Sequence, residues 1–318
     1  MTAYIIRRLL SVIPITIGVM LITFFVFRVV GGNPAYRIAG KNATPARIAQ
    51  ISHERGYDKP LFVNFHSFPR HVLDAQFPQL AWNLVRLDFG QSIVTKERVS
   101  TMLREGVGPS LCVTTPLFVM ELFLGVGLAL LAAYYRNTWI DRGLVLLSVM
   151  GMSISSLVYI MLAQYWLASV WRLFPVWGFE SPRYLILPVM VGVTAGVGGE
   201  LRFYRTVMLD EMYQEYVRTA RAKGVPSRTI LFRHVLRNAL IPILTNVIIA
   251  IPFLYTGALL LENFFGIPGL GRLTVMALFN FDDDVVFATT FIGSILFVLF
   301  NALTDIGYTW ADPRIRLK

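Results

Sequence analysis

Two glutamates stand inside long apolar runs of the sequence, where a carboxylate is costly. Glu121 lies near the middle of the run 113–135, and Glu200 lies near the end of the run 185–201. A carboxylate at bilayer depth costs several kcal/mol unless it is paired or hydrated, so it is a functional candidate by default. We expect Glu121 either to line a wet pathway or to pair across an interface. We expect Glu200 to pair with a nearby arginine: Arg136, Arg202 or Arg205.

Glycines precede Glu200 in the same run. Gly192 and Gly196 have the G-x-x-x-G spacing, and Gly198 and Gly199 follow them. In a membrane helix this spacing permits a close approach of a second helix. The same glycines could instead leave backbone groups lining a path, and the residues alone leave both alternatives open.

The polar segment 202–238 is built as two short helices with a firm break between them. Glu215 can pair with the residues three and four positions later on one helix face. Gly224 then supplies a helix stop, and Pro226 prevents the helix from continuing. Ala220 and Ala222 are small, so we expect both to face close surfaces. A basic loop that only rests on anionic lipid needs no such order of residues, so the pattern favours a rigid contact element.

Motifs for enzymatic chemistry are missing from the sequence. The stretch 40–42 lacks the flanking residues of a phosphate-binding loop, and His53 has no second histidine in the register of a zinc protease. His66 and His71 are five residues apart and share no helix face, which argues against a metal site. Cys112 is the single cysteine, which excludes an internal disulfide and a cysteine-based zinc site. The sequence predicts no catalytic residue, no metal and no cofactor in this chain.

The composition places these residues in a membrane protein. Of the 318 residues, 55% are hydrophobic and only 15% are charged, and the mean hydropathy is +0.60. A soluble domain carries about 25% charged residues, and about 20 apolar residues in a row cross a bilayer. The net charge of +10 fits basic loops at a membrane better than binding to nucleic acid. We predict an all-α polytopic protein whose six membrane helices are the runs 9–30, 113–135, 144–170, 185–201, 239–261 and 285–308.

Lysines and arginines indicate the orientation of these six helices. With the N-terminus inside, the four inner segments hold 15 basic residues and the two short outer loops hold 3. This asymmetry predicts that both ends and the segment 202–238 are cytoplasmic. The predicted regions are an N-terminal anchor helix at 1–30, an external segment at 31–112, a core of five membrane helices at 113–308 and a cytoplasmic tail at 309–318.

The sequence EYVRTARAKG at 215–224 resembles the EAA loop of ABC importer permeases. The resemblance extends along nearly the whole chain and is strongest to the B-type permeases of dipeptide and oligopeptide importers. It is carried by the following stretches: YIIRRLL at 4–10, ATPARIA at 43–49, LDFGQS at 87–92, HVLRNA at 234–239, PGLGR at 268–272 and DPRIR at 312–316. Asp283 and Asp284 depart from this family, which commonly has Tyr-Pro there.

The resemblance implies a type I ABC importer permease in the bacterial inner membrane that moves peptides or related small solutes. It implies a second, homologous permease, two ATP-binding subunits that carry ATP and magnesium, an external substrate-binding protein and contact with membrane lipid. It also implies that one short helix couples the chain to the ATP-binding subunits. The coupling residues would be Glu215, Tyr216, Arg218, Thr219, Ala220, Arg221, Ala222, Lys223 and Gly224.

Two other classes of membrane protein compete with this interpretation. A proton-coupled secondary transporter could use Glu121 as its proton carrier. Such transporters are commonly built from inverted repeats with paired broken helices, and six spans without internal symmetry argue against that. A membrane enzyme is disfavoured by the missing motifs.

Overall fold

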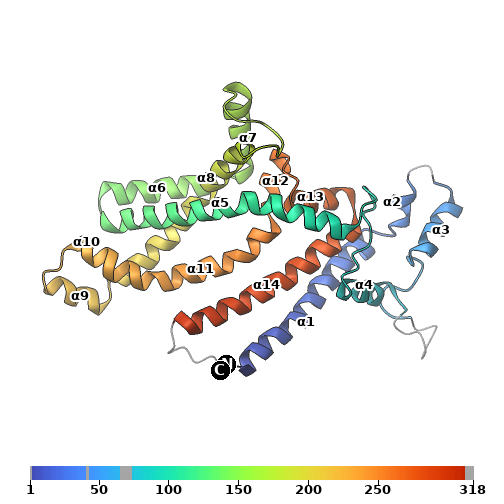
Figure 1. Ribbon diagram of the computed structural model, residues 1–318, viewed down its shortest axis with the longest axis horizontal. Coiled ribbons are helices and arrows are strands. Elements are labelled where there is room, and N and C mark those ends of the chain that lie inside the picture. The colour runs from blue at the N-terminus through green and yellow to red at the C-terminus, as the bar shows by residue number, and fades with distance from the viewer. Residues whose placement is uncertain (1, 41–42, 65–73, 312–318) are drawn as a thin grey trace. The chain divides into compact units, whose positions relative to one another are not determined.

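The computed structural model describes residues 2–40, 43–64 and 74–311 of the chain (Figure 1). The pair His66 and His71 therefore lies outside the described residues, as does the expected tail from residue 312 onward. Across the described ranges the secondary structure is helical, apart from one isolated bridge between Gln91 and Arg98. The prediction of an all-α polytopic protein is confirmed.

Five helical stretches are long and apolar enough to cross a membrane. They are Leu10–Val30, Val99–Tyr134, Arg183–Met212, Ser227–Phe265 and Asp283–Leu303. The first consists of the end of α1 (Thr2–Phe24) and a π-helical continuation, η1 (Phe25–Val30). The second is α5 (Val99–Tyr134), which begins well before the apolar run at 113.

The third expected span, 144–170, consists of two helices joined at a sharp bend. Helix α6 (Trp139–Ser153) ends at Ile154, and α7 (Ser156–Ala163) with η3 (Gln164–Val170) leaves it at 88° (Figure 1). Ser155 takes an extended conformation, and its hydroxyl accepts a hydrogen bond from the Leu157 amide at 3.4 Å. A serine that caps a new helix explains why the apolar run does not continue straight.

The fourth and fifth spans also differ from the apolar runs. Helix α8 (Arg183–Met212) continues beyond residue 201 into the polar segment. The fifth run divides into α11 (Leu236–Thr256) and α12 (Leu259–Phe265), separated at Gly257 with φ of +78°. Only glycine adopts this conformation readily, so the helix is interrupted at this position.

The chain divides into two compact units. One comprises Met1–Gly106 and Leu273–Leu299, and the other comprises Val107–Arg272 and Phe300–Lys318. The first unit thus joins α1, η1 and the external segment with most of α14 (Asp283–Ala311). The first span and most of the last span therefore belong to the same unit, a grouping that residue patterns do not indicate.

The first unit is assembled around phenylalanines. Phe24 is buried, and its ring lies 5.5 Å from Phe62, 5.4 Å from Phe77 and 6.4 Å from Phe287. Three short helices of this unit follow the first span: α2 (Ala35–Ala39), α3 (Pro45–Glu54) and α4 (Gln76–Val85). Helix α3 begins after Thr44, whose hydroxyl accepts a hydrogen bond from the Arg47 amide at 3.3 Å.

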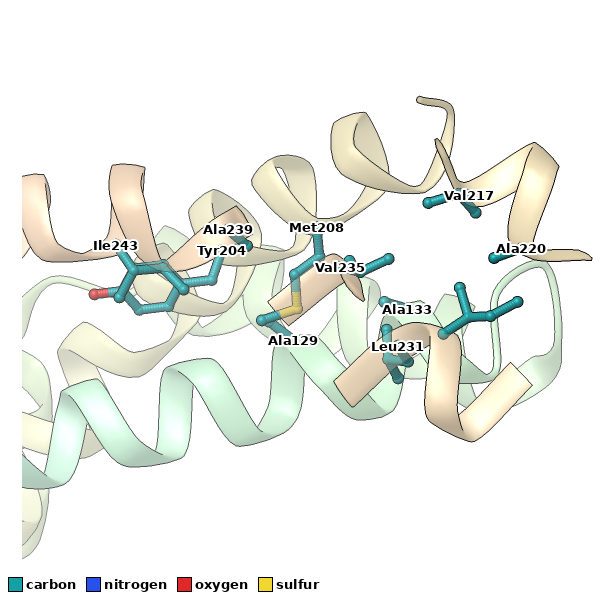
Figure 2. Packing of buried hydrophobic residues seen from close by; sticks show 11 residues of the cluster. Ala129, Ala133, Tyr204, Met208, Val217, Ala220, Leu231, Val235, Ala239 and Ile243 are labelled. Atoms are coloured by element: carbon teal, nitrogen blue, oxygen red, sulfur yellow. The ribbon is translucent and has the colours of Figure 1, made fainter. Parts of the chain in front are cut away.

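The second unit contains two apolar clusters. One joins α5, α7, α8 and α12 around Val113, Leu187 and Phe265. The other, seen in Figure 2, joins α5, α8 and α11 to the short helices α9 (Glu215–Ala222) and η4 (Ile230–Val235). Helices α10 (Ser227–Thr229) and α13 (Leu270–Asn280) complete the chain.

Candidate coupling and pathway sites

Helix α9 forms where the sequence predicts a capped element. The Glu215 carboxylate pairs with Arg218 at 3.0 Å, and the Thr219 hydroxyl donates to the Glu215 carbonyl at 3.0 Å. The ion pair is well exposed, so it contributes at most about 1 kcal/mol. The helix is therefore held in place chiefly by the face that it buries.

The buried face of α9 consists of Val217 and Ala220. Both point into the cluster of Figure 2, which also contains Met208 and Val235. Ala220 faces a close surface, as its small size predicts, and that surface belongs to the same chain. Ala222 is exposed and remains the small residue on the outer face.

The end of α9 is set by its backbone. The Val225 amide donates to the Ala220 carbonyl at 3.1 Å, and the Gly224 amide donates to the Arg221 carbonyl at 2.9 Å. This pair of bonds is the Schellman pattern, which requires a left-handed residue, and Gly224 has φ of +76°. No atom lies within 4 Å of the position that a Cβ would take at Gly224, so backbone strain and not lack of space requires glycine there.

The outer face of α9 is basic. Arg218, Arg221 and Lys223 are exposed along it. Tyr216 is half-buried, and its hydroxyl donates to the Glu211 carboxylate. Burial raises the pKa of Tyr216 to about 12, so this hydroxyl keeps its proton and remains a donor at neutral pH. The helix thus presents cations outward while its inner side is fixed to the chain.

Helix α8, which leads into α9, is fixed to α6 by an ion pair that residue patterns did not indicate. The Arg205 guanidinium donates to both oxygens of Asp141, at 2.7 and 2.9 Å. Asp141 is buried, and it also accepts from the Asn137 amide at 3.1 Å. A two-point contact of this kind fixes orientation as well as distance.

The glycines of α8 bring it close to α5. A Cβ at Gly192 would collide with Leu117, and a Cβ at Gly196 would collide with the Glu121 carboxylate. Gly192 and Gly196 also line an open cavity of about 330 Å³, together with Leu117, Ser156 and Leu261. The structure therefore brings together the three residues predicted for a pathway or interface, Glu121, Gly192 and Gly196.

Glu200 lies one turn beyond Gly196 on α8. The prediction that its carboxylate pairs with a nearby arginine is wrong. The amide nitrogen of Asn246 donates to the Glu200 carboxylate at 3.2 Å and lies 3.2 Å from the Tyr204 hydroxyl. Arg205, an expected partner, binds Asp141 instead. Asn246 is 46 residues away in the sequence, on α11, so its role follows only from the fold.

A second buried carboxylate holds the loop that follows α11. Glu262 is fully buried and accepts from the Ser110 hydroxyl at 2.8 Å and from the amides of Ala258, Gly271 and Arg272 at 2.9, 2.7 and 3.2 Å. Each oxygen has two donors, which satisfies the charge. The sequence analysis did not single out Glu262. The one local indication of its role is a charged residue placed between glycines, at 257 and at 266–271.

Three consecutive aspartates at the start of α14 hold the external segment of the first unit. Asp282 accepts from the Ser92 hydroxyl and from the Ile93 amide at 3.0 Å. Asp283 and Asp284 pair with three arginines: Arg28 at 3.5 Å and Arg37 at 3.6 Å for Asp283, and Arg55 at 3.9 Å for Asp284. The residues that depart from the resembled family thus have a structural role here.

Comparison with known proteins identifies the family. Residues 125–317 match the family described as the binding-protein-dependent transport system inner membrane component, and residues 1–114 match its N-terminal part. A putative peptide transport system permease protein of Brucella abortus is 35% identical over 99% of both chains. A probable peptide ABC transporter permease protein of Sinorhizobium fredii is 34% identical over 99% of this chain and all of its own. A glutathione transport system permease protein of Salmonella typhi is 33% identical over the full length of both.

The chain belongs to this family of inner membrane components of binding-protein-dependent transport systems. It is the permease subunit of an ABC importer in the inner membrane, a transport protein rather than an enzyme. Such a permease works with ATP-binding and substrate-binding partners. The comparisons give no support to a proton-coupled transporter.

Proposed function

We propose that this permease imports dipeptides, oligopeptides or related small solutes into the cytoplasm. The proposal is supported by the peptide and glutathione permeases to which the chain is similar along its full length. A second, homologous permease completes the pathway, and two ATP-binding subunits hold ATP and magnesium and hydrolyse the ATP. An external binding protein delivers the cargo and largely sets its identity.

Coupling to the ATP-binding subunits runs through α9. The observation that carries this proposal is that α9 buries Val217 and Ala220 in its own chain and leaves a basic face outward. A helix anchored in this way moves together with α8, to which Met208 in the same cluster belongs. The ATP-binding subunit then docks onto Arg218, Arg221 and Lys223 through an acidic or polar groove. A movement of that groove displaces α9 and α8 together.

Helix α8 connects the coupling contact to the pathway. Gly196 lies 12 residues before Met208 on the same helix, which is about 18 Å along its axis. A movement of the inner end of α8 therefore changes the contact between Gly196 and Glu121 on α5. We infer that Glu121, Gly192 and Gly196 border the pathway at this level and that alternating access opens and closes it there.

Reconstitution of the complete importer tests the function. The permease, its second permease and the ATP-binding subunits are placed in vesicles with binding protein and a labelled peptide. We expect peptide accumulation that requires ATP and binding protein and that persists when the proton gradient is collapsed. Uptake driven by a proton gradient without ATP-binding subunits would contradict the proposal.

A further inference from the structure

Asn246 on α11 joins two residues of α8 that lie one turn apart. Its amide nitrogen donates to the Glu200 carboxylate and to the Tyr204 hydroxyl, at 3.2 Å in each case. A side-chain amide carries two N–H hydrogens, so this contact uses both of them. Glu200 and Tyr204 are four residues apart and therefore lie on one face of α8. Asn246 is thus held at two points along the axis of the neighbouring helix.

Helix α5 packs closely against the same contact. A Cβ at Gly125 would lie 2.8 Å from the Cβ of Glu200 and 3.2 Å from the Tyr204 ring. Tyr204 is only 1% exposed, and Glu200 and Asn246 are half-buried. The three polar groups therefore lie where α5, α8 and α11 meet, inside stretches that are apolar enough to cross the membrane.

The Tyr204 ring also belongs to the apolar cluster that holds α9. Val217 and Ala220 of α9 are members of that cluster, and Figure 2 shows the Tyr204 hydroxyl pointing away from them. Tyr204 therefore takes part in the cluster through its ring and contacts α11 through its hydroxyl. Contiguous packing thus leads from α9 to Asn246.

The contact is better suited to fixing the position of the helices than to adding stability. Hydrogen bonds between membrane helices add only modestly to stability, because the unfolded chain in the membrane also finds partners for its polar groups. They do fix helix register, which is the best-attested role of a single buried polar residue. Sliding of α11 along α8 in either direction takes Asn246 away from one of its two acceptors.

Register between these two helices matters because both are attached to the coupling element. The chain passes from α8 through α9 and η4 into α11, so a displacement of α9 acts on both helices. Helix α8 carries Gly192 and Gly196, and α12, which follows α11, carries Leu261. These three residues line the same cavity. Its two sides move together only if α8 and α11 do not slide past one another.

We propose that Asn246 is a positioning residue for transport. Through Glu200 and Tyr204 it fixes α8 to α11, so that a displacement of α9 moves both sides of the cavity. This inference rests on the proposed coupling through α9. Loss of the contact should raise the ATP consumed per imported peptide. Loss of stability alone would lower the amount of assembled importer and leave that ratio unchanged.

Asn246→Leu tests the proposal in reconstituted importers with binding protein and a labelled peptide. Leucine has nearly the same size as asparagine but no hydrogen to donate to Glu200 or Tyr204. The measured quantity is the number of ATP molecules hydrolysed per peptide imported, for each assembled complex. We expect a several-fold rise in this ratio. An unchanged ratio would overturn the proposal.

Thr245→Val is the matched control on α11. The Thr245 hydroxyl donates to the Ile241 carbonyl of its own helix at 3.1 Å, so its removal costs a hydrogen bond without separating two helices. We expect the ratio of the unmodified importer. A rise equal to that of Asn246→Leu would contradict a specific role for Asn246.

Two further variants separate the contact from the charge of Glu200. Glu200→Gln removes the charge but keeps an oxygen that accepts from Asn246, so the ratio should stay near that of the unmodified importer. Glu200→Gln combined with Asn246→Leu removes both the charge and the contact, and its ratio should stay raised. A return to the unmodified value in this double variant would show that an unpaired carboxylate, and not the lost contact, caused the effect, and would overturn the proposal.

Tyr204→Phe keeps the test decisive where Asn246→Leu assembles poorly. It removes one of the two acceptors and leaves the ring in the apolar cluster, so we expect assembled importer and a smaller rise in the same ratio. An unchanged ratio would contradict the proposal. Failure of the proposed function is visible separately, either as no ATP-dependent uptake by the unmodified importer or as normal coupling when the outer face of α9 is altered.

Discussion

Asp283 and Arg28 form an ion pair inside the first unit, with 3.5 Å between Oδ2 and Nη1. The Asp283 side chain is fully buried and that of Arg28 is 9% exposed, while Arg37 approaches the same carboxylate at 3.6 Å. The facing atoms form no hydrogen bond with other described residues, so charge holds the group together. Arg28 also lies over the Tyr57 ring at 4.3 Å, which adds a cation–π contact.

Asp283→Asn should therefore destabilise the permease strongly. The substitution leaves the buried Arg28 and the partly exposed Arg37 beside a neutral amide, and breaking a buried pair in this way costs about 3–5 kcal/mol. We expect a clear fall in the midpoint of thermal unfolding of the purified protein in detergent. Asp74→Asn is the control, because the pair of Asp74 with Lys59 is partly exposed and is expected to contribute about 0–1 kcal/mol. Equal effects of the two variants would contradict the structural role of Asp283.

Glu262→Gln tests the buried carboxylate of the second unit. The amide nitrogen of glutamine cannot accept a hydrogen bond, so at least one of the four donors loses its partner. Each unpaired buried donor costs about 1–3 kcal/mol. We expect faster hydrogen exchange at the amides of Gly271 and Arg272 and a lower unfolding midpoint. Glu180→Gln, at an exposed carboxylate, should leave both measurements unchanged.

Local sequence patterns predicted the elements that depend on neighbouring residues. The stop at Gly224 follows from residue types within a few positions, and it is present in the structure. Each of the five long apolar helical stretches covers most of one expected run for the same reason, since about 20 apolar residues suffice to identify a span.

Contacts between distant residues could not be predicted in this way. Ala220 faces its own chain because η4 returns beneath α9, and nothing near position 220 indicates that return. Asn246 reaches Glu200 only because α8 and α11 pack together. The apolar run 144–170 hid the bend at Ile154, because hydropathy does not distinguish a straight helix from two helices joined by serine.

Cysteine labelling from each side of the membrane tests the predicted orientation. After replacement of Cys112, single cysteines are placed at Lys96 and Arg228, both of which are exposed. The distribution of 15 inner against 3 outer basic residues predicts labelling of position 96 from outside and of position 228 from the cytoplasm. Labelling of position 228 from outside would reverse the whole orientation.

Glu121→Gln and Gly196→Ala test the proposed pathway. Removal of the Glu121 charge should lower peptide uptake while assembly and ATP binding persist. Gly196→Ala places a methyl group against the Glu121 carboxylate and should lower uptake to a similar extent. Gly127→Ala is the matched control on α5, because no atom lies within 4 Å of the added Cβ. Uptake equal to that of the control in both test variants would remove these residues from the pathway.

Substitutions in and after α9 test the coupling contact. Gly224→Val forces a β-branched residue to a φ of +76° and should misdirect the turn into Pro226, at a cost of about 1–2 kcal/mol or more. Gly224→Asn is the control, since asparagine tolerates this conformation best among the other residues. Ala222→Trp places a large ring on the exposed face of α9 and should obstruct docking, whereas Lys223→Ala removes one exposed charge and should have a small effect.

Ala220→Trp is expected to act differently from these variants, because Ala220 is buried in the cluster of Figure 2. It should lower the stability of the permease itself, measured as a fall in the unfolding midpoint in the absence of the ATP-binding subunits. Ala222→Trp should instead leave that midpoint nearly unchanged, and both Gly224→Val and Ala222→Trp should uncouple ATP hydrolysis from uptake in reconstituted importers. Normal coupled activity in both of these variants would show that the ATP-binding subunits engage another part of the chain.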